Sequence, residues 1–353
     1  MEHVAIFLKT LAGGGAEKQA TLLAKVLSDS YAVHCILWTD AGLEPRYAEI
    51  LDHAGVKMHI LRGNAVSKLN SLRKTVVREK IRVLFCYLTA ANAMGAIATA
   101  GTQCRAVPGL RSSKLPRMKM ISDRFVTNRL TCVTVANSFC GRGEFVKHGF
   151  KAEKVRVIPN LIDLGPAEAE TAAHEGITVI SVGRFVDAKD YPSAIRAVAQ
   201  ARREVPSLRY KIIGYGELEA EVRAEVKKAG IEDITEILIN PPDIDRHLGM
   251  ADIFLMSSVY EGTSNALLEA LRAGLAAVAT DVGDNGVILD RGRAGVLVNS
   301  GDTEAMAGAI VSLVSDPVKR AELTAAGRRV LEKTFSPESF EKQYKLLITQ
   351  IIK

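Results

Sequence analysis

Residues 251–280, ADIFLMSSVYEGTSNALLEALRAGLAAVAT, decide the fold of this chain. Asp252–Met256 and Ala276–Thr280 are short apolar runs that predict strands, and a helical pattern begins between them near Asn265. A strand, a helix and a second strand in succession indicate parallel strands covered by helices. The strands are apolar almost without interruption, which is typical of a sheet that is buried on both faces.

The same alternation extends from this stretch to both ends of the chain. Before residue 160 the predicted strands are Val4–Leu8, Val33–Trp38, Val56–Leu61, Arg82–Leu88, Arg105–Gly109, Cys132–Ala136 and Val155–Ile158. After residue 176 the further predicted strands are Ile177–Val182, Arg209–Ile213, Ile234–Ile239 and Gly295–Val298. Helices with apolar residues at three- and four-residue spacing are predicted over Ala16–Ser28, Ser67–Lys80 and Ser138–Lys147. The fold class is therefore α/β, with parallel sheets.

One interruption divides the chain into two domains. Residues 159–176 have no strand pattern and are rich in Pro, Gly and Glu, as is typical of a linker. We predict two doubly wound, Rossmann-like domains over residues 1–160 and 177–335, which face each other across a cleft and are joined by a linker at 161–176. Residues 336–353 are predicted to form a helix that packs back on the first domain. Ligands of such sheets bind beyond the carboxyl ends of the strands, so the cleft is the expected site.

Composition excludes several classes of protein. Of the 353 residues, 24% are charged and 48% are hydrophobic, so an intrinsically disordered chain is excluded. The five cysteines are scattered and never spaced C-x-x-C, which argues against a disulfide scaffold or a structural zinc site and fits a reducing cytoplasm. The first residues lack the pattern of a signal peptide. Val83–Cys104 carries no charge, but its polar and small residues predict a strand and a helix rather than a membrane span.

Charge is distributed unevenly between the two halves. Residues 1–160 contain 24 Lys and Arg against 11 Asp and Glu, while the remainder contains 22 against 29. Either these are two solvated surfaces, or the basic half faces an anionic partner such as a membrane surface or a phosphorylated acceptor. Nucleic acid is the less favoured partner, because aromatic residues are only 5% of the chain and no recognition motif is present.

Three motifs carry candidate chemistry at predicted strand ends. Gly13, Gly14 and Gly15 lie between a strand and a helix, where they form either an anion-binding helix N-terminus or a flexible turn. The second motif is SVGRFVDAK at 181–189, where Arg184 and Lys189 either grip a diphosphate or are simply solvated.

The third and strongest motif is YEGTSNALLEA at 260–270. Glu261 precedes the helix and Glu269 lies inside it, and their eight-residue separation suits two carboxylates that accept hydrogen bonds from hydroxyls at different points of an extended ligand. The backbone N–H groups of Gly262, Thr263 and Ser264 would face a charge at the helix start. The alternative is a capped helix with surface glutamates.

Together these motifs resemble the family 4 retaining glycosyltransferases, the glycosyl transferases group 1, which have the GT-B fold. The resemblance rests on the spacing E-x7-E of Glu261 and Glu269, the run Gly274–Thr280, the Gly183-Arg184 pair with Lys189, the glycine loop 13–15 and the turn 214–216. It covers most of the chain and is clearest in residues 177–300.

The resemblance implies a role for each matching residue. Residues 177–335 would bind a nucleotide-diphosphate sugar, with UDP the favoured nucleotide, and residues 1–160 the acceptor. Arg184 and Lys189 would hold the diphosphate, Glu261 the donor sugar and Glu269 the ribose. The remaining donor-binding residues would be Gly14, Gly15, Gly183, Gly214, Tyr215, Asn240, Gly262, Thr263, Ser264 and Asn265. The family works without a metal or other cofactor, so none is expected.

One departure from the family concerns a histidine that many members carry near the donor sugar. The corresponding stretch here, residues 109–114, reads GLRSSK, and Arg111 and Ser112 are the candidates for its place. Arg111 and Lys114 are candidate acceptor-binding residues in a basic run that continues to Lys119, which we interpret as a loop over an anionic acceptor or as a solvated loop.

The sequence therefore predicts a cytoplasmic glycosyltransferase that transfers a sugar with retention to a saccharide or lipid-linked acceptor in cell-surface polysaccharide or lipopolysaccharide biosynthesis. Its basic half suggests peripheral contact with an anionic membrane. The alternatives are an epimerase-like enzyme of the same architecture and a non-catalytic partner subunit that binds nucleotide sugars.

Overall fold

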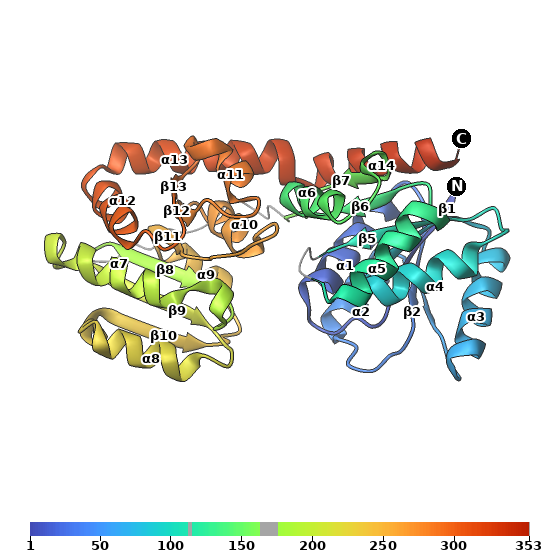
Figure 1. The fold of residues 1–353 in the computed structure, drawn as a ribbon, viewed down its shortest axis with the longest axis horizontal. Helices are drawn as coiled ribbons and strands as arrows, with labels where there is room; N and C mark the ends of the chain where they lie inside the picture. Colours follow the sequence, from blue (N-terminus) through green and yellow to red (C-terminus); the bar gives the residue numbers. More distant parts are fainter. Residues whose placement is uncertain (112–114, 163–175, 353) are drawn as a thin grey trace. The chain divides into compact units, whose positions relative to one another are not determined.

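The computed structural model describes residues 1–111, 115–162 and 176–352, which divide into two compact units. The first unit contains Met1–Leu161 and Pro337–Lys353, and the second contains Ile162–Ser336. Each unit is a parallel sheet covered by helices (Figure 1), which confirms the predicted α/β class. The predicted linker lies almost wholly outside the described residues, and the cleft between the domains stays a prediction.

The first unit has a seven-stranded sheet in the order β3-β2-β1-β4-β5-β6-β7. Its strands are β1 (His3–Leu8), β2 (Ala32–Leu37), β3 (Lys57–Ile60), β4 (Ile81–Tyr87), β5 (Arg105–Leu110), β6 (Thr134–Ala136) and β7 (Val155–Val157). Its helices are α1 (Gly15–Ser28), α2 (Pro45–His53), α3 (Ala65–Arg78), α4 (Thr89–Thr99), α5 (Arg117–Phe125), α6 (Phe139–Lys147) and α14 (Pro337–Ile352).

The second unit has a six-stranded sheet in the order β10-β9-β8-β11-β12-β13. Its strands are β8 (Thr178–Val182), β9 (Arg209–Gly214), β10 (Thr235–Ile239), β11 (Ile253–Met256), β12 (Ala276–Thr280) and β13 (Val296–Val298). Its helices are α7 (Tyr191–Glu204), α8 (Glu219–Lys228), α9 (Ile244–Gly249), α10 (Asn265–Arg272), α11 (Asn285–Ile288), α12 (Thr303–Ser315) and α13 (Pro317–Val330).

Each sheet separates two apolar cores, which explains why the strands lack a polar face. Ile253 and Leu255 of β11 lie in one core of the second unit, while Phe254 and Met256 lie in the other. Successive side chains of a strand point to opposite faces, so both sets are buried only if helices cover both sides. The strand pattern of 252–256 therefore follows from two-sided burial.

The C-terminal helix α14 belongs to the core of the first unit. Phe340, Tyr344 and Leu347 are buried there, and the Tyr344 ring packs edge-on against Phe85 of β4 with centroids 5.3 Å apart. Among the described residues no helix is long and apolar enough to cross a bilayer. The uncharged stretch Val83–Cys104 instead supplies most of β4 and all of α4.

The order of the strands reverses once in each sheet. The chain proceeds outward from β1 to β3 and then returns to β4 beside β1, and it repeats this path from β8 to β10 and back to β11. The loops that follow β8 and β11 therefore leave the sheet in opposite directions and open a crevice between them. This crevice positions the candidate site of the second unit.

Three histidines form a hydrogen-bonded row across β1, β2 and β3. His3 Nδ1 lies 3.0 Å from His34 Nε2, and His34 Nδ1 lies 3.0 Å from His59 Nε2. Burial, with help from the neighbouring His59, lowers the pKa of His34 to about 4, and burial also lowers the pKa of His59, although Glu79 acts in the opposite direction on both. Burial therefore favours the neutral form of His34 and His59.

We expect the first unit to lose stability as the pH falls from 6.5 towards 4. The unfolded chain protonates His34 at its ordinary pKa, whereas the folded chain resists protonation, so the free energy of unfolding decreases over this window. Allowing for solvent screening, the loss between pH 7.5 and pH 5 should be about 1–2 kcal/mol. Urea denaturation followed by the fluorescence of Trp38, the single tryptophan and a residue of this unit, measures it.

His53→Gln is the matched control for this prediction. His53 is an exposed histidine of α2 whose ring bonds only the Glu49 carbonyl of its own helix, so its replacement should leave the pH dependence unchanged. His34→Gln should reduce the dependence of the free energy of unfolding on pH. Equal slopes for wild type and His34→Gln would show that the row does not control acid stability.

Candidate functional site

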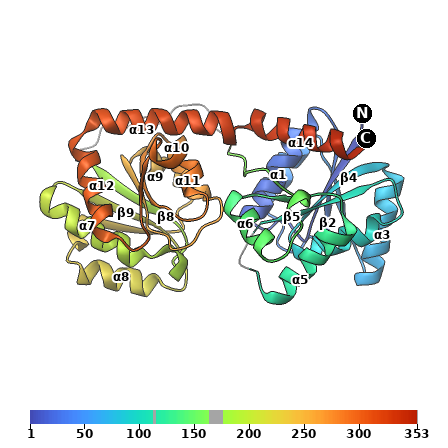
Figure 2. The same ribbon diagram turned by 45° about the horizontal axis from the view of Figure 1, so that its top comes forward.

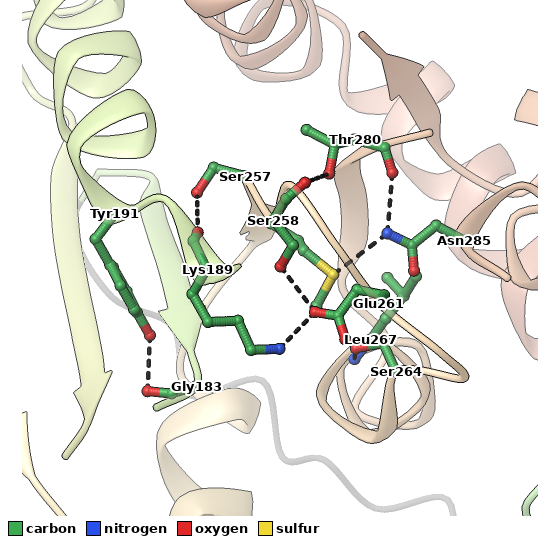
Figure 3. Close-up of polar contacts among 11 residues, drawn as sticks. Gly183, Lys189, Tyr191, Ser257, Ser258, Glu261, Ser264, Leu267, Thr280 and Asn285 are labelled. Atoms are coloured by element: carbon green, nitrogen blue, oxygen red, sulfur yellow. Dashed lines mark hydrogen bonds and ion pairs between the residues drawn. The ribbon is translucent and has the colours of Figure 1, made fainter. Parts of the chain in front are cut away.

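Two loops meet at the carboxyl ends of β8 and β11, and serine and backbone hydrogen bonds tie them together. Ser257 Oγ lies 2.8 Å from the carbonyl oxygens of both Lys189 and Asp190, and the Val259 N–H donates to the Ala188 carbonyl at 3.0 Å. Figure 3 shows Ser257 beside the backbone of Lys189. The residues after β8 are therefore held in register with those after β11.

An ion pair lies where these loops meet. Lys189 Nζ donates to Glu261 Oε1, and the same oxygen accepts from Ser258 Oγ at 2.7 Å (Figure 3). The side chains are 21% and 11% exposed respectively, so solvent screens their attraction only in part. An ammonium has three N–H donors, of which Glu261 takes one. The pair thus presents a positioned cation and carboxylate at the mouth of the crevice.

The β11 loop is supported from behind by β12. Thr280 Oγ1 donates to the Ser258 carbonyl at 2.6 Å, and Asn285 Nδ2 donates to the Thr280 carbonyl at 2.9 Å. Both Thr280 and Asn285 are fully buried. Their hydrogen bonds fix the backbone that carries Ser258 and Glu261, so the ion pair rests on a rigid base.

Glycines allow two backbone segments to touch beside this pair. A Cβ on Gly214 would overlap the Gly183 carbonyl oxygen and lie 2.6 Å from the Phe185 ring, and a Cβ on Gly216 would lie 2.8 Å from the Phe185 nitrogen. The Phe185 N–H donates to the Tyr215 carbonyl at 2.8 Å. The turn 214–216 therefore packs directly on 183–185, and Arg184 and Tyr215 are left exposed at the surface.

Tyr191 fixes the other side of Gly183. Its hydroxyl donates to the Gly183 carbonyl at 2.9 Å, and burial raises the pKa of Tyr191 well above its usual range. The phenol therefore keeps its proton and its donor role. A Cβ on Gly183 would meet the Tyr191 hydroxyl at 3.3 Å and Lys189 Cε at 3.4 Å, so little space remains for a side chain there.

Helix α10 carries Glu269 and begins at the ion-pair loop. Ser264 caps it by accepting from the Leu267 N–H at 3.4 Å, as the predicted helix start near Asn265 requires. Glu269 is half-buried and lies one turn inside the helix. Gly262 and Thr263 are braced by Asp284, whose N–H donates to the Gly262 carbonyl at 3.0 Å and whose Oδ2 accepts from Thr263 Oγ1 at 3.1 Å.

Most of the predicted residues of the second unit lie at neighbouring strand ends. Asn240 follows β10 with a φ of +45° and donates its N–H to the Gly214 carbonyl at 3.1 Å. The predicted residues at or directly after the carboxyl ends of β8, β9, β10 and β11 are Gly183, Arg184, Lys189, Gly214, Tyr215, Asn240, Glu261, Gly262, Thr263 and Ser264, and Asn265 and Glu269 follow in α10. Sequence reasoning missed Ser257, Ser258, Tyr191 and Asp284, although the Ser-Ser pair directly after a buried strand is a signal that could have identified the first two.

Gly14 and Gly15 lie in the first unit, after β1 and at the start of α1. Gly14 is the N-cap residue of this helix and makes no side-chain cap. A Cβ on Gly13 would meet nothing within 4 Å. The approach of these glycines to the donor stays a prediction.

The basic run after β5 differs from its interpretation as a loop. Arg117 and Lys119 lie in helix α5, because Met120 and Asp123 turn inward and give residues 117–125 a packing face. Lys114 lies outside the described residues. Arg111 points inward, with its guanidinium carbon 4.2 Å from the centroid of the Tyr87 ring.

Burial leaves the Arg111 guanidinium incompletely paired. Its Nε and Nη1 are buried and have no hydrogen-bond partner among the described residues. The described residues also contain no group of His, Cys, Asp and Glu that could hold a metal ion.

Comparison with known proteins identifies relatives of this arrangement. Residues 167–330 match the family model described as glycosyl transferases group 1. The chain is 28% identical over 206 residues to the amylovoran biosynthesis glycosyltransferase AmsK of Erwinia amylovora, a match covering 55% of this chain and 50% of that protein. It is 25% identical over 303 residues to an N-acetylgalactosaminyltransferase of Campylobacter jejuni that acts on a diphospho-undecaprenol substrate, covering 80% and 81%. The chain thus spans about half the length of AmsK and most of the second relative.

Solved structures extend the likeness to the whole chain. HepE of Anabaena, crystallised with UDP, superimposes with a TM-score of 0.84 at 19% identity and covers 99% of this chain and 100% of its own. The sucrose-phosphate synthase of Thermosynechococcus elongatus has a TM-score of 0.79 at 15% identity and covers 99% of both chains. At these identities the likeness shows a shared fold. The chain therefore has the GT-B fold, and its residues 167–330 match the glycosyl transferases group 1 family model.

Proposed function

We propose that this protein is a retaining glycosyltransferase that transfers a sugar from a UDP-sugar to a saccharide or lipid-linked acceptor in cell-surface polysaccharide or lipopolysaccharide biosynthesis. The observation that carries the proposal is the Lys189–Glu261 pair at the strand-order reversal of the second unit, next to the backbone contact between 183–185 and 214–216. Relatives named for amylovoran and lipopolysaccharide core biosynthesis, and the HepE complexes with UDP and UDP-glucose, support the substrate class.

Arg184 and Lys189 are proposed to hold the diphosphate. Arg184 is exposed at the end of β8, and Lys189 is fixed by the bonds of its own backbone to Ser257 and of its side chain to Glu261. A fork-shaped guanidinium and a point-like ammonium can together neutralise the charge that develops on a departing diphosphate. The N–H groups at the start of α10, from Gly262 to Asn265, add partial positive charge on the same side.

The two carboxylates are proposed to bind different parts of the donor. Glu261, whose Oε1 already accepts from Lys189 and Ser258, accepts from hydroxyls of the sugar, and Glu269, inside α10, accepts from the ribose. Gly183, Gly214, Tyr215 and Asn240 complete the nucleotide side, where the lack of side chains at the glycines lets a ligand approach the backbone closely.

The reaction joins the acceptor hydroxyl oxygen to the anomeric carbon as the bond from that carbon to the β-phosphate oxygen breaks. The hydroxyl proton passes to the departing diphosphate, and UDP leaves. The transition state carries positive charge on the sugar ring and negative charge on the diphosphate. The chain contributes by positioning and by pre-arranged charge, since the Lys189–Glu261 pair is held before the donor arrives.

The first unit is proposed to bind the acceptor through Arg111 and Lys114, while Gly14 and Gly15 approach the β-phosphate of the donor. Nε and Nη1 of Arg111 have no hydrogen-bond partner within 1–111, 115–162 and 176–352, which supports an acceptor that brings an oxygen to them, because buried N–H donors without partners are costly. The excess of Lys and Arg in residues 1–160 supports an acceptor at the cytoplasmic face of an anionic membrane.

Release of nucleotide from a panel of UDP-, GDP- and ADP-sugars tests the proposal. Wild type should hydrolyse or transfer from a UDP-sugar, and Lys189→Ala should lower the rate by about 10²–10³-fold because the diphosphate loses its positioned cation. Lys227→Ala, which removes an exposed lysine of α8, is the control and should retain the wild-type rate. Tight donor binding without any release, with and without candidate acceptors, would favour a non-catalytic partner subunit instead.

A second prediction separates the two carboxylates by calorimetry. Glu269→Gln should weaken the binding of both UDP and the UDP-sugar by roughly tenfold to a hundredfold, because a charge-assisted hydrogen bond to the ribose is lost. Glu261→Gln should weaken the binding of the UDP-sugar by a similar factor and leave the affinity for UDP nearly unchanged. Glu322→Gln, on the exposed face of α13, is the control. Identical losses of affinity for both ligands in both variants would contradict the assignment of ribose and sugar.

The stereochemistry of the transfer is tested separately. NMR of the anomeric proton of the transferred sugar shows whether its configuration is retained.

A further inference from the structure

Helix α5 packs against the first unit with a polar face. Asp123 is 2% exposed, and its carboxylate accepts from Thr89 Oγ1 at 2.7 Å and from Asn92 Nδ2 at 2.9 Å. Met120 lies on the same inward face. These contacts fix the rotation of α5 about its axis, so the opposite face must point away from the unit.

The outward face of α5 carries the larger apolar side chains. Met118 is 75% exposed, Ile121 42% and Phe125 57%, and their three- and four-residue spacing puts them on one stripe. Figure 2 shows α5 at the lower margin of its unit. A surface helix normally buries its apolar stripe and exposes its polar residues, whereas α5 buries Asp123 beside one apolar residue, Met120, and exposes methionine, isoleucine and phenylalanine. Such an inversion marks an interaction surface.

The charges around this stripe have one sign. Arg117 and Lys119 flank Met118 and are exposed, and Arg124 and Arg129 follow along the same segment. The one acidic residue between 115 and 132 is the buried Asp123. Along its own segment the exposed stripe is therefore accompanied by cations and by no exposed carboxylate.

We infer that the α5 surface, defined by Arg117, Met118, Lys119, Ile121 and Phe125, binds an anionic lipid bilayer. An apolar stripe edged by Lys and Arg inserts its side chains at the boundary of headgroups and acyl chains, while the cations contact the lipid phosphates. A helix of nine residues lies in this interface and does not span it. This inference rests on the proposed lipid-linked acceptor, whose headgroup would have to be reached from the membrane.

A bilayer fits this surface better than an acidic protein does. Three exposed side chains on one short helix cannot supply the roughly 1,200 Å² that a stable protein–protein interface buries. A membrane needs less area from the protein, because each cation near an anionic surface adds its own attraction and the apolar side chains add insertion. Helix α5 also follows β5 closely, so the surface lies in the unit that holds Arg111.

Co-sedimentation of the full chain with vesicles tests the inference. One set of vesicles is phosphatidylcholine alone, and the other contains phosphatidylglycerol as a third of the lipid. Wild type should bind the anionic vesicles and not the neutral ones. Arg117→Glu with Lys119→Glu, and separately Met118→Ser with Ile121→Ser and Phe125→Ser, should each lower the partition coefficient at least about tenfold.

Matched variants in the same unit control for charge and for apolar area. Lys25→Glu with Lys74→Glu makes the same change of charge on α1 and α3, and Val66→Ser with Val77→Ser removes exposed apolar side chains from α3. Both controls should bind vesicles like wild type. Wild-type binding by the α5 variants, equal loss in the controls, or equal binding of wild type to neutral and anionic vesicles would each overturn the inference.

Nucleotide release measured without vesicles keeps this test separate from the proposed function. The α5 variants should release nucleotide at the wild-type rate, because none of the substituted residues belongs to the donor site. Vesicle binding that depends on α5 in a protein that never releases nucleotide supports the surface and contradicts the transferase. Nucleotide release together with vesicle binding that the α5 substitutions do not change supports the transferase and contradicts the proposed α5 surface.

Discussion

Parallel pairing of β8 with both β9 and β11 is the constraint on which the candidate site depends. Parallel strands end at one edge of their sheet, so the residues after β8, β9, β10 and β11 emerge together although they are separated by tens of residues in sequence. The reversal of strand order at β8 opens the space between the first and last of these loops. Lys189 and Glu261 meet in that space, and they come from the two loops that the reversal separates.

The Lys189–Glu261 ion pair would destabilise the folded protein without the contacts that surround it. Charges that are mostly removed from water are stabilised only when their remaining lone pairs and protons are also satisfied. Ser258 provides the second bond to Glu261, and Ser257 holds the backbone of Lys189, so neighbouring serines serve the two partners separately. The glycine contacts at 183 and 214 add rigidity without side chains, which leaves the backbone accessible to a ligand.

Sequence reasoning succeeded where local pattern and burial agree and failed where they conflict. Every predicted strand lies within two residues of an observed one at each end, because two-sided burial makes strands apolar throughout. The basic run that ends at Lys119 was wrongly interpreted as a loop in its last residues, because only Met120 and Asp123 form the buried face of helix 117–125. Asp123 belongs to that face because it bonds Thr89 and Asn92, and no local pattern shows partners that far away in the chain. Arg111 likewise turns inward to Tyr87, which only the packing of β4 beside β5 makes possible.

The sequence by itself determined the α/β class, the strand positions and the residues of the donor motifs, because periodicity, glycine and capping residues act over a few neighbours along the chain. Tertiary structure alone decided which of those residues meet. It paired Lys189 with Glu261, placed Ser257 and Ser258 around them and turned the apolar stripe of α5 outward. Each of these outcomes depends on contacts between segments distant in sequence, and such contacts are set by the packing of sheets and helices rather than by local propensity.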